Sequence, residues 1–289
     1  MQPIFFTKLS TIGNNYLILN YLEQPELSLD YANLAKHITN PRTGILADGI
    51  IILLPSQLAD FKMIIYNRDG SRAKTCGNGL RLIGHYLLEI ERFNQPQIKI
   101  ETDANVSILT HEEDLITVDL GLAHSLIDPC HPLSLKSQVT DYCGDIETPY
   151  GIWQADIISM GNPHFIIYTD DDHEAFEEEM ERISKNYDVN VGMLTVINSN
   201  ELLLTTYERG SGLTSACGTN AAAAVASAVA RRQVNPYELI TVHLPGGDLY
   251  LKWNEEAHLL AIGSCTKICC GTYFFESKRG CLKIDDPLN

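Results

Sequence analysis

YNRDGSRAKTCGNG, residues 66–79, and YERGSGLTSACGTN, residues 207–220, are two stretches of one chain that share a pattern. Each stretch begins with a tyrosine and reaches a Cys-Gly pair ten residues later, at Cys76 in the first and at Cys217 in the second. The two cysteines are separated by close to half of the 289 residues. Similarity at this spacing predicts a duplicated fold, with a functional site where its two copies meet.

A second pair of stretches supports the duplication. IGNNYLI, residues 12–18, is similar to MGNPHFI, residues 160–166. A chain of 289 residues is also long enough for two domains of about 100–150 residues each. We therefore expect two similar α/β domains that are related by a pseudo-twofold axis and bind a ligand between them.

Local patterns place each cysteine just before a helix. The apolar run Ile50–Leu54, between a glycine and a proline, predicts a buried strand, and Ile64–Tyr66 predicts another. Apolar residues at helical spacing follow Cys76, and the alanine-rich stretch Ala221–Arg232 follows Cys217. We therefore expect both cysteines to lie at helix N-termini.

The composition indicates an ordinary globular protein, with 45% hydrophobic and 20% charged residues. A net charge of −16 and a pI near 4.9 argue against nucleic acids and anionic membranes as partners, because both favour clustered Lys and Arg. The first ten residues lack a signal-peptide pattern, and the apolar segments are too short to span a bilayer. We expect a soluble cytosolic protein with reduced thiols.

Two opposed thiols suit one kind of reaction, the inversion of a carbon that carries an acidic proton. A thiolate removes the proton from one face, a thiol delivers a proton to the other face, and the roles exchange in the reverse direction. A helix N-terminus can lower the pKa of a thiol from its ordinary value of about 8.5. We therefore expect a lowered pKa for both thiols.

The same helix starts are expected to bind a carboxylate, since helix N-termini bind anions and glycine permits their close approach. The backbone N–H groups expected to do so are those of Gly77, Asn78, Gly218 and Thr219. Negative charge that spreads from the α-carbon onto the carboxyl oxygens would then be stabilised. This scheme requires no cofactor, neither pyridoxal nor a metal.

Other polar residues have two interpretations each. His164 and Glu208 can polarise the thiols, although a single histidine is more often structural. Arg209 can bind a distal carboxylate or form a surface ion pair. Three asparagines can bind substrate or stabilise turns: Asn67, Asn162 and Asn190. Each of the two cysteines, taken alone, is typical of a small buried residue, and their matched contexts argue against that interpretation.

The remaining cysteines do not predict a metal site. Cys265, Cys269 and Cys270 lack the paired spacing of a structural zinc site, and we expect them in strands. The acidic run Asp170–Glu179 predicts a solvated loop and a charged helix face. The cysteines expected to be structural or incidental are Cys130, Cys143 and Cys281.

Taken together, the motifs of both halves resemble the diaminopimelate epimerase family in order and spacing, over nearly the whole chain. The segments that carry the resemblance are Phe6–Lys8, Gly13–Asn14, Asn67–Ser71, Cys76–Arg81, Gly161–His164, Tyr207–Gly210, Ala216–Thr219 and Leu244–Gly247. The two cysteine motifs make it specific. The resemblance implies an epimerase that interconverts L,L- and meso-diaminopimelate without a cofactor, in lysine and peptidoglycan synthesis.

The resemblance also implies an architecture. Each domain is expected to be a mixed or antiparallel sheet curled around a central helix, with the active site in the cleft between the domains. The first domain is expected at residues 1–122 together with about 273–289, because the final strands return to it in the family, and the second at residues 123–272. A linker is expected near Gly121–Pro132. The family further suggests a homodimer.

The family implies a role for each site residue. Cys76 and Cys217 are expected to be the catalytic acid/base pair, with His164 and Glu208 assisting them. The expected substrate-binding residues are Asn14, Asn67, Gly77, Asn78, Asn162, Asn190, Glu208, Arg209, Gly218 and Thr219.

The chain departs from the family pattern at four places. Asn15 stands where the family usually has Asp, Leu46 and Asn220 stand where it has Gly, and Gly263–Cys265 replaces Gly-Pro-Ala. Asn220 opens the helix behind Cys217, so we hypothesise a loosened substrate selectivity. The rival interpretations are a related two-thiol racemase for glutamate or proline, and a non-enzymatic thiol or metal-binding protein.

Overall fold

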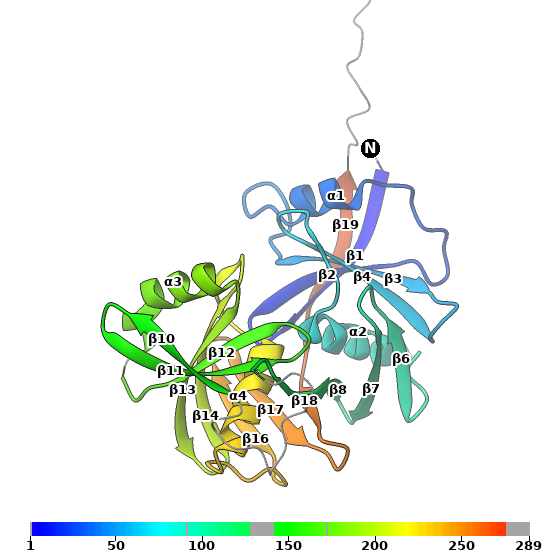
Figure 1. Cartoon of the computed structure of the whole chain (residues 1–289). Coiled ribbons are helices and arrows are strands. Elements are labelled where there is room, and N and C mark those ends of the chain that lie inside the picture. The colour runs from blue at the N-terminus through cyan, green and yellow to red at the C-terminus, as the bar shows by residue number, and fades with distance from the viewer. Residues whose placement is uncertain (1, 91, 128–141, 172, 276–289) are drawn as a thin grey trace, which may run out of the picture.

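The computed structural model describes residues 2–90, 92–127, 142–171 and 173–275. Figure 1 shows two lobes, each with strands around one central helix. Strands β8 (Leu115–Leu122) and β18 (His258–Gly263) lie where the lobes meet, and they pair in antiparallel fashion. This pairing joins the strands of both lobes into one hydrogen-bonded sheet.

The first lobe contains two helices and the first eight strands. In chain order its elements are β1 (Gln2–Thr11), β2 (Asn14–Asn20), α1 (Tyr31–Ile38), β3 (Gly49–Pro55), β4 (Phe61–Asn67), β5 (Arg72–Ala73), α2 (Gly77–Glu89), β6 (Gln97–Glu101), β7 (Val106–Glu112) and β8. Strand β2 is parallel to β3, and β4 is parallel to β6, whereas β3–β4, β6–β7 and β7–β8 are antiparallel.

The second lobe repeats this order. Its elements are β9 (His124–Ser125), β10 (Cys143–Thr148), β11 (Gly151–Ser159), β12 (Pro163–Tyr168), the 3-10 turn η2 (His173–Phe176), α3 (Glu177–Tyr187), β13 (Asn190–Asn198), β14 (Glu201–Glu208), β15 (Gly212–Thr214), α4 (Gly218–Ala230), β16 (Ile240–Leu244), β17 (Gly247–Trp253) and β18. Strand β12 is parallel to β13 and β14 to β16, and the other neighbours are antiparallel.

The repeated pairing confirms the expected α/β fold of two similar halves. The central helix of each half touches strands on several sides. Helix α2 contacts β1, β2, β7 and β8, and helix α4 contacts β11 to β14, β17 and β18. The duplication seen in the sequence is therefore a duplication of the whole α/β unit.

The last strand returns to the first lobe. Strand β19 (Thr266–Phe275) pairs with β1 along its length, from Thr266 opposite Ser10 to Phe275 opposite Gln2, and the two lie side by side in Figure 1. The return was expected near residue 273, and the paired strand begins at Thr266. Residues 276–289, with Cys281, and the linker positions 128–132, with Cys130, lie outside the described residues.

Helix α4 is enclosed by the second lobe, and all of its residues except Thr219 are buried. Alanine has the highest helix propensity and the small volume that lets strands approach from several sides. The helix begins at Gly218, three residues before the predicted start, and ends at Ala230 rather than Arg232. Arg232 has φ = 59°, the left-handed conformation that ends helices.

The other predicted elements are found. Strands β3 and β4 contain the two predicted apolar runs, and α3 begins with three acidic residues. Cys269 and Cys270 lie in β19, whereas Cys265 lies just before it. In the part of the chain that the structure describes, no helix is both long and apolar enough to cross a membrane.

Candidate active site

Both cysteines are helix N-caps with extended backbones, since Cys76 has φ −157° and ψ 117° and Cys217 has φ −129° and ψ 112°. The Gly79 amide donates to Sγ of Cys76 at 3.4 Å. In the second lobe, Sγ of Cys217 lies 3.4 Å from Oγ1 of Thr219. Both cysteines therefore lie at helix starts, as the sequence predicts, and the Cys76 sulfur accepts from a free N–H group of its helix, whereas the Cys217 side chain makes no such cap bond.

The two helix starts face each other across the junction of the lobes. Nδ2 of Asn78, in the first lobe, donates to the Ala216 carbonyl beside Cys217 at 3.4 Å. Nδ2 of Asn14 donates to the same carbonyl at 3.2 Å. A Cβ added to Gly218 would lie 3.8 Å from Oδ1 of Asn78. The fold thus brings together the two Cys-Gly motifs that are half a chain apart.

Glu208 lies beside the thiols, at the end of β14. Oγ1 of Thr214 donates to its Oε1 at 2.7 Å. Burial raises the pKa of Glu208 from its ordinary value, against the effects of Thr214 and of the nearby Cys217 thiol, which lower it. The carboxylate also raises the pKa of Cys76 through its charge. Glu208 is therefore within electrostatic reach of both sulfurs.

Burial reverses the expected pKa shift of the thiols. Desolvation raises the pKa of Cys76 and of Cys217 above the ordinary value, and in Cys217 the Glu208 charge raises it further. The helix-start amides of Gly79, Asn78 and Asn220 lower these pKa values, as expected, but by less than desolvation raises them. The expectation of a lowered pKa is therefore wrong, because burial raises the pKa of both thiols and keeps them protonated.

Tyr16, on β2, was missed by the sequence analysis. Its side chain is buried, with 5% exposure, in the apolar cluster against which Cys76 packs. Burial raises the pKa of Cys76, and the Tyr16 hydroxyl is one of the groups that lower it in part. One signal could have found it, because Tyr16 in the stretch 12–18 stands at the position of His164 in the stretch 160–166.

His164 is fully buried, and the hydrogen bond described for its ring is to Asn162 rather than to a thiol, with 3.0 Å between Nε2 and Oδ1. Burial lowers the pKa of His164 to about 3, although the nearby Asn220 side chain raises it in part. The imidazole is therefore neutral at physiological pH.

Most of the predicted substrate-binding side chains have partners within the protein. Nδ2 of Asn67 donates to Ser71 at 3.0 Å. Asn190 donates to the Pro163 carbonyl at 3.0 Å and accepts from the Arg209 amide at 3.0 Å. The Arg209 guanidinium, 43% exposed, forms the surface ion pair that was its alternative interpretation, with Nη1 2.8 Å from Oδ2 of Asp188.

Arg81 is a second residue that the sequence analysis missed. It is fully buried on α2, and its Nη2 donates to Oδ1 of Asn78 at 2.6 Å. Its Nε and Nη1 have no hydrogen-bond partner among the described residues. The bond fixes the Asn78 amide so that its nitrogen faces Ala216 in the other lobe. Arg81 therefore helps to hold the two helix starts together.

A family model of diaminopimelate epimerase matches residues 6–126 and 157–268, which include both cysteine motifs. The chain belongs to the diaminopimelate epimerase family. The diaminopimelate epimerase of Bacillus cereus is 34% identical to this chain, over 96% of the chain and 99% of its own length. That of Bacillus mycoides is 35% identical, with the same shares covered.

Solved structures show the same fold at low sequence identity. A probable proline racemase from Agrobacterium radiobacter superposes with a TM-score of 0.70 at 14% identity, covering 94% of this chain and 93% of its own. A hydroxyproline epimerase from Agrobacterium vitis gives a TM-score of 0.66 at 14% identity, covering 94% and 91%. The two-lobed fold of the family is therefore shared with these enzymes.

Two departures from the family pattern have structural consequences. Leu46 has φ = 50°, in the left-handed region that favours the family's glycine. Asn220 is fully buried, and its Nδ2 donates to the Val191 carbonyl at 3.1 Å. Its Oδ1 is left without a hydrogen-bond partner in the described structure, as is Nδ1 of His164. The Asn220 side chain therefore acts on His164, whereas its backbone amide acts on the Cys217 sulfur.

No group of three or more His, Cys, Asp or Glu side chains that could hold a metal ion occurs within residues 2–90, 92–127, 142–171 and 173–275. Cys269 and Cys270 are exposed, and Cys265 is half-buried. The fold thus brings together two thiols, one carboxylate, one phenol and the amides of two helix starts.

Proposed function

We propose that this protein interconverts L,L- and meso-diaminopimelate, with Cys76 and Cys217 as the two acid/base groups. The observation that carries the proposal is the meeting of two Cys-capped helix starts, linked through the Asn78–Ala216 hydrogen bond. The curated relatives, at 34–35% identity over almost their full length, are named diaminopimelate epimerase. An isomerase of this family needs two proton-transfer groups on opposite faces of one carbon.

The proposed step moves two protons. The thiolate of one cysteine removes the α-proton, so a C–H bond breaks and an S–H bond forms. The thiol of the other cysteine then protonates the opposite face, and its own S–H bond breaks. The helix-start amides of Gly77, Asn78, Gly218 and Thr219 bind the α-carboxylate and stabilise the charge that develops on it.

A bound substrate also brings a positive charge near the thiols. Both thiols have a raised pKa because they are buried and lie near Glu208. The ammonium group of a bound amino acid brings a positive charge to this site, and an opposite charge nearby favours the thiolate. The acid/base pair is therefore activated by the substrate itself.

The other family residues are proposed to hold the substrate. Glu208 assists Cys217 as the carboxylate beside its thiol, and His164 acts through Asn162. Arg209 exchanges Asp188 for the distal carboxylate, since an exposed ion pair contributes only about 0–1 kcal/mol. The asparagines proposed to complete the site are Asn14, Asn67, Asn162 and Asn190.

The test is turnover by three single variants, followed as conversion of L,L-diaminopimelate to the meso isomer by chiral chromatography. Cys76→Ala and Cys217→Ala each remove one acid/base group and should lower kcat at least about 100-fold. Cys143→Ala, in β10, is the control and should retain activity. Full turnover by either active-site variant would contradict the proposal.

A broader substrate range is a second proposal, because Asn220 replaces the family's glycine next to His164. The rival substrates are glutamate and proline, and proteins of this fold include enzymes named for proline and hydroxyproline. Comparison of kcat/KM for diaminopimelate, glutamate and proline separates the two proposals. If this protein prefers diaminopimelate over glutamate and proline by the same ratio of kcat/KM as the Bacillus cereus relative, the proposal of a broader substrate range has no basis.

We place the enzyme in the cytosol, where a reducing environment keeps both thiols free.

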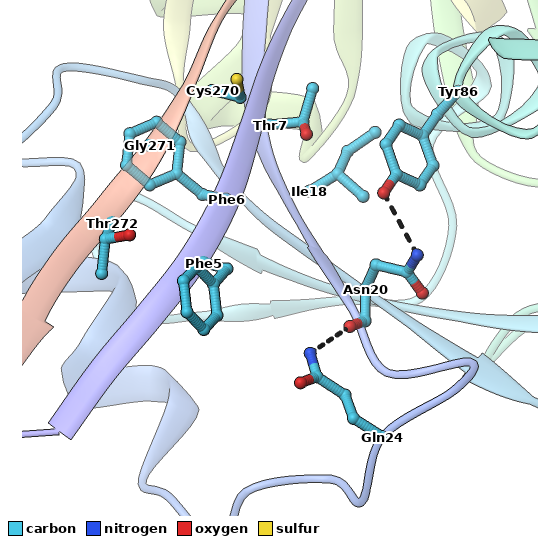
Figure 2. A pocket seen from close by; sticks show the side chains of 10 residues that line it. All are labelled: Phe5, Phe6, Thr7, Ile18, Asn20, Gln24, Tyr86, Cys270, Gly271 and Thr272. Atoms are coloured by element: carbon cyan, nitrogen blue, oxygen red, sulfur yellow. Dashed lines mark hydrogen bonds between the residues drawn. The ribbon is translucent and has the colours of Figure 1, made fainter. Parts of the chain in front are cut away.

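We also propose that the protein forms a homodimer. The first seven residues of β19 are exposed, and an exposed edge strand is a ready site for pairing. A pocket of about 420 Å³ at this face is lined by residues that include Phe5, Cys270 and Thr272, and Figure 2 shows their side chains. A sedimentation mass of a single 32.2-kDa chain would contradict the dimer.

A further inference from the structure

The Tyr16 ring has a fixed place in the first lobe. Tyr16 lies on β2 opposite Gly49 on the parallel strand β3. A Cβ added to Gly49 would lie 2.8 Å from Cε1 of Tyr16, closer than carbon atoms approach each other. The ring therefore lies over the bare backbone of Gly49, and its direction is set by the sheet.

The Tyr16 hydroxyl is placed against the Cys76 sulfur. Tyr16 belongs to the buried apolar cluster against which the Cys76 side chain packs, and its hydroxyl lowers the pKa of Cys76, against the larger effect of burial, which raises it. The same sulfur accepts from the Gly79 amide at 3.4 Å. Cys76 thus sits between a helix-start amide and a phenol.

The surroundings keep this hydroxyl protonated. Desolvation raises the pKa of Tyr16 well above its ordinary value, and the charges of Cys76, Asp48 and Glu208 raise it further. A phenol with a raised pKa does not give up its proton to the thiol. It can only donate a hydrogen bond, and such a bond favours the thiolate over the thiol.

The sequence repeat points to Tyr16 independently of these contacts. Tyr16 and His164 occupy the same place in the stretches 12–18 and 160–166, and Asn67 and Glu208 occupy the same place in the stretches 66–79 and 207–220. In the second lobe the group beside Cys217 is Glu208, whereas Asn67 in the first lobe carries no charge. In the first lobe a group other than the Asn67 side chain must therefore assist Cys76, and Tyr16 is the polar side chain placed beside it.

We propose that the Tyr16 hydroxyl is a catalytic group that donates a hydrogen bond to the Cys76 thiolate, given that Cys76 is one of the two acid/base thiols. When Cys76 takes a proton from carbon, the new S–H bond replaces the negative charge and the Tyr16 bond weakens. The phenol keeps its proton throughout. The two thiols are thus assisted by chemically different groups, a neutral phenol for Cys76 and a carboxylate for Cys217.

The test uses Tyr16→Phe, which keeps the ring over Gly49 and removes only the hydroxyl. The pH dependence of iodoacetamide alkylation at Cys76 and at Cys217 is measured by peptide mass spectrometry, without substrate. The matched control is Tyr86→Phe, which removes a hydroxyl that accepts from Asn20 on the same lobe, as Figure 2 shows. Turnover of L,L-diaminopimelate is measured for the same proteins.

The expected result is a shift of the Cys76 alkylation curve to higher pH by about one unit, with the Cys217 curve unchanged. The expected kinetic effect is an approximately tenfold lower kcat with KM little changed. An unchanged Cys76 curve, or an equal shift in Tyr86→Phe, would overturn the proposal. A shifted curve in a protein that does not turn over diaminopimelate would support the Tyr16 contact and reject the proposed substrate.

Discussion

The imidazole of His164 is kept neutral by its burial in the fold. It is fully buried, and burial lowers its pKa to about 3, whereas a histidine in the unfolded chain titrates near 6.5. Between these two pH values the unfolded chain binds a proton that the folded protein excludes. His164 therefore contributes stability above pH 6.5, and this contribution is lost as the pH falls from 6.5 toward 3.

The free energy of unfolding should therefore decrease by about 2 kcal/mol between pH 6.5 and pH 5.0 through this group alone. The measurement is urea unfolding at both pH values for the wild type, for His164→Asn and for the exposed control His37→Asn. The decrease should be smaller in His164→Asn by that amount and unchanged in His37→Asn. Equal decreases in all three proteins would show that His164 binds a proton in the folded state.

The two cysteines could be predicted from sequence because their local contexts repeat. The contact of Tyr16 with Cys76 depends on how separate segments of the chain come together, and in the sequence only its match to His164 points to it. Arg81 and Asn78 are three residues apart on α2, but the bond from Asn78 to Ala216 joins distant segments and could not be predicted. The raised thiol pKa values have a similar origin. The helix N-terminus is a local feature and lowers the pKa, but the larger desolvation effect comes from the rest of the fold.

At the scale of elements, the segment between α1 and β3 contains a strained residue. Leu46 has φ = 50°, which costs a leucine about 1–2 kcal/mol, and its side chain is 48% exposed. Nζ of Lys8 donates to the Leu46 carbonyl at 2.6 Å and helps to hold this conformation. The family pattern has glycine at this position, and glycine adopts positive φ without that cost.

Leu46→Gly should therefore raise the free energy of unfolding by about 0.5–1 kcal/mol, after the greater freedom of glycine in the unfolded chain is subtracted. Urea unfolding measures the change. The matched control is Leu58→Gly at an exposed position without positive φ, which should lower stability. A loss of stability in Leu46→Gly would show that the turn is not strained.

The elements near the site were predictable to different degrees. Cys76 and Cys217 were expected just before helices, and they cap α2 and α4, because propensity and apolar spacing act locally. The parallel pairing of β2 with β3, and of β12 with β13, could not be read from the chain. It depends on crossover segments that pass through α1 and α3.

At the scale of the whole molecule, the two lobes are joined as parts of one sheet. Ile116 on β8 pairs with Gly263 on β18, and Leu122 pairs with His258. Nδ1 of His258 lies 2.8 Å from Oδ2 of Asp119 across this seam. The joint was not predictable, because β8 and β18 are far apart in the sequence and pair through tertiary packing rather than through a local pattern.

The duplicated fold is symmetric, but the site it encloses is not. Each lobe supplies one thiol at a helix start, whereas Tyr16 stands beside Cys76 and Glu208 beside Cys217. A substrate centre that is inverted presents its proton to one thiol in one stereoisomer and to the other thiol in the opposite one. Two differently assisted thiols fit this task, because the two directions of the reaction begin at different sulfurs.

The most direct test of the two-thiol account is deuterium incorporation from L,L-diaminopimelate in D₂O during early turnover, followed by NMR and mass spectrometry. Two opposed thiols predict deuterium at the inverted carbon of the meso product, while the remaining L,L substrate keeps its α-proton. Deuterium that enters the remaining substrate as fast as the product would show a single exchanging group and contradict the account.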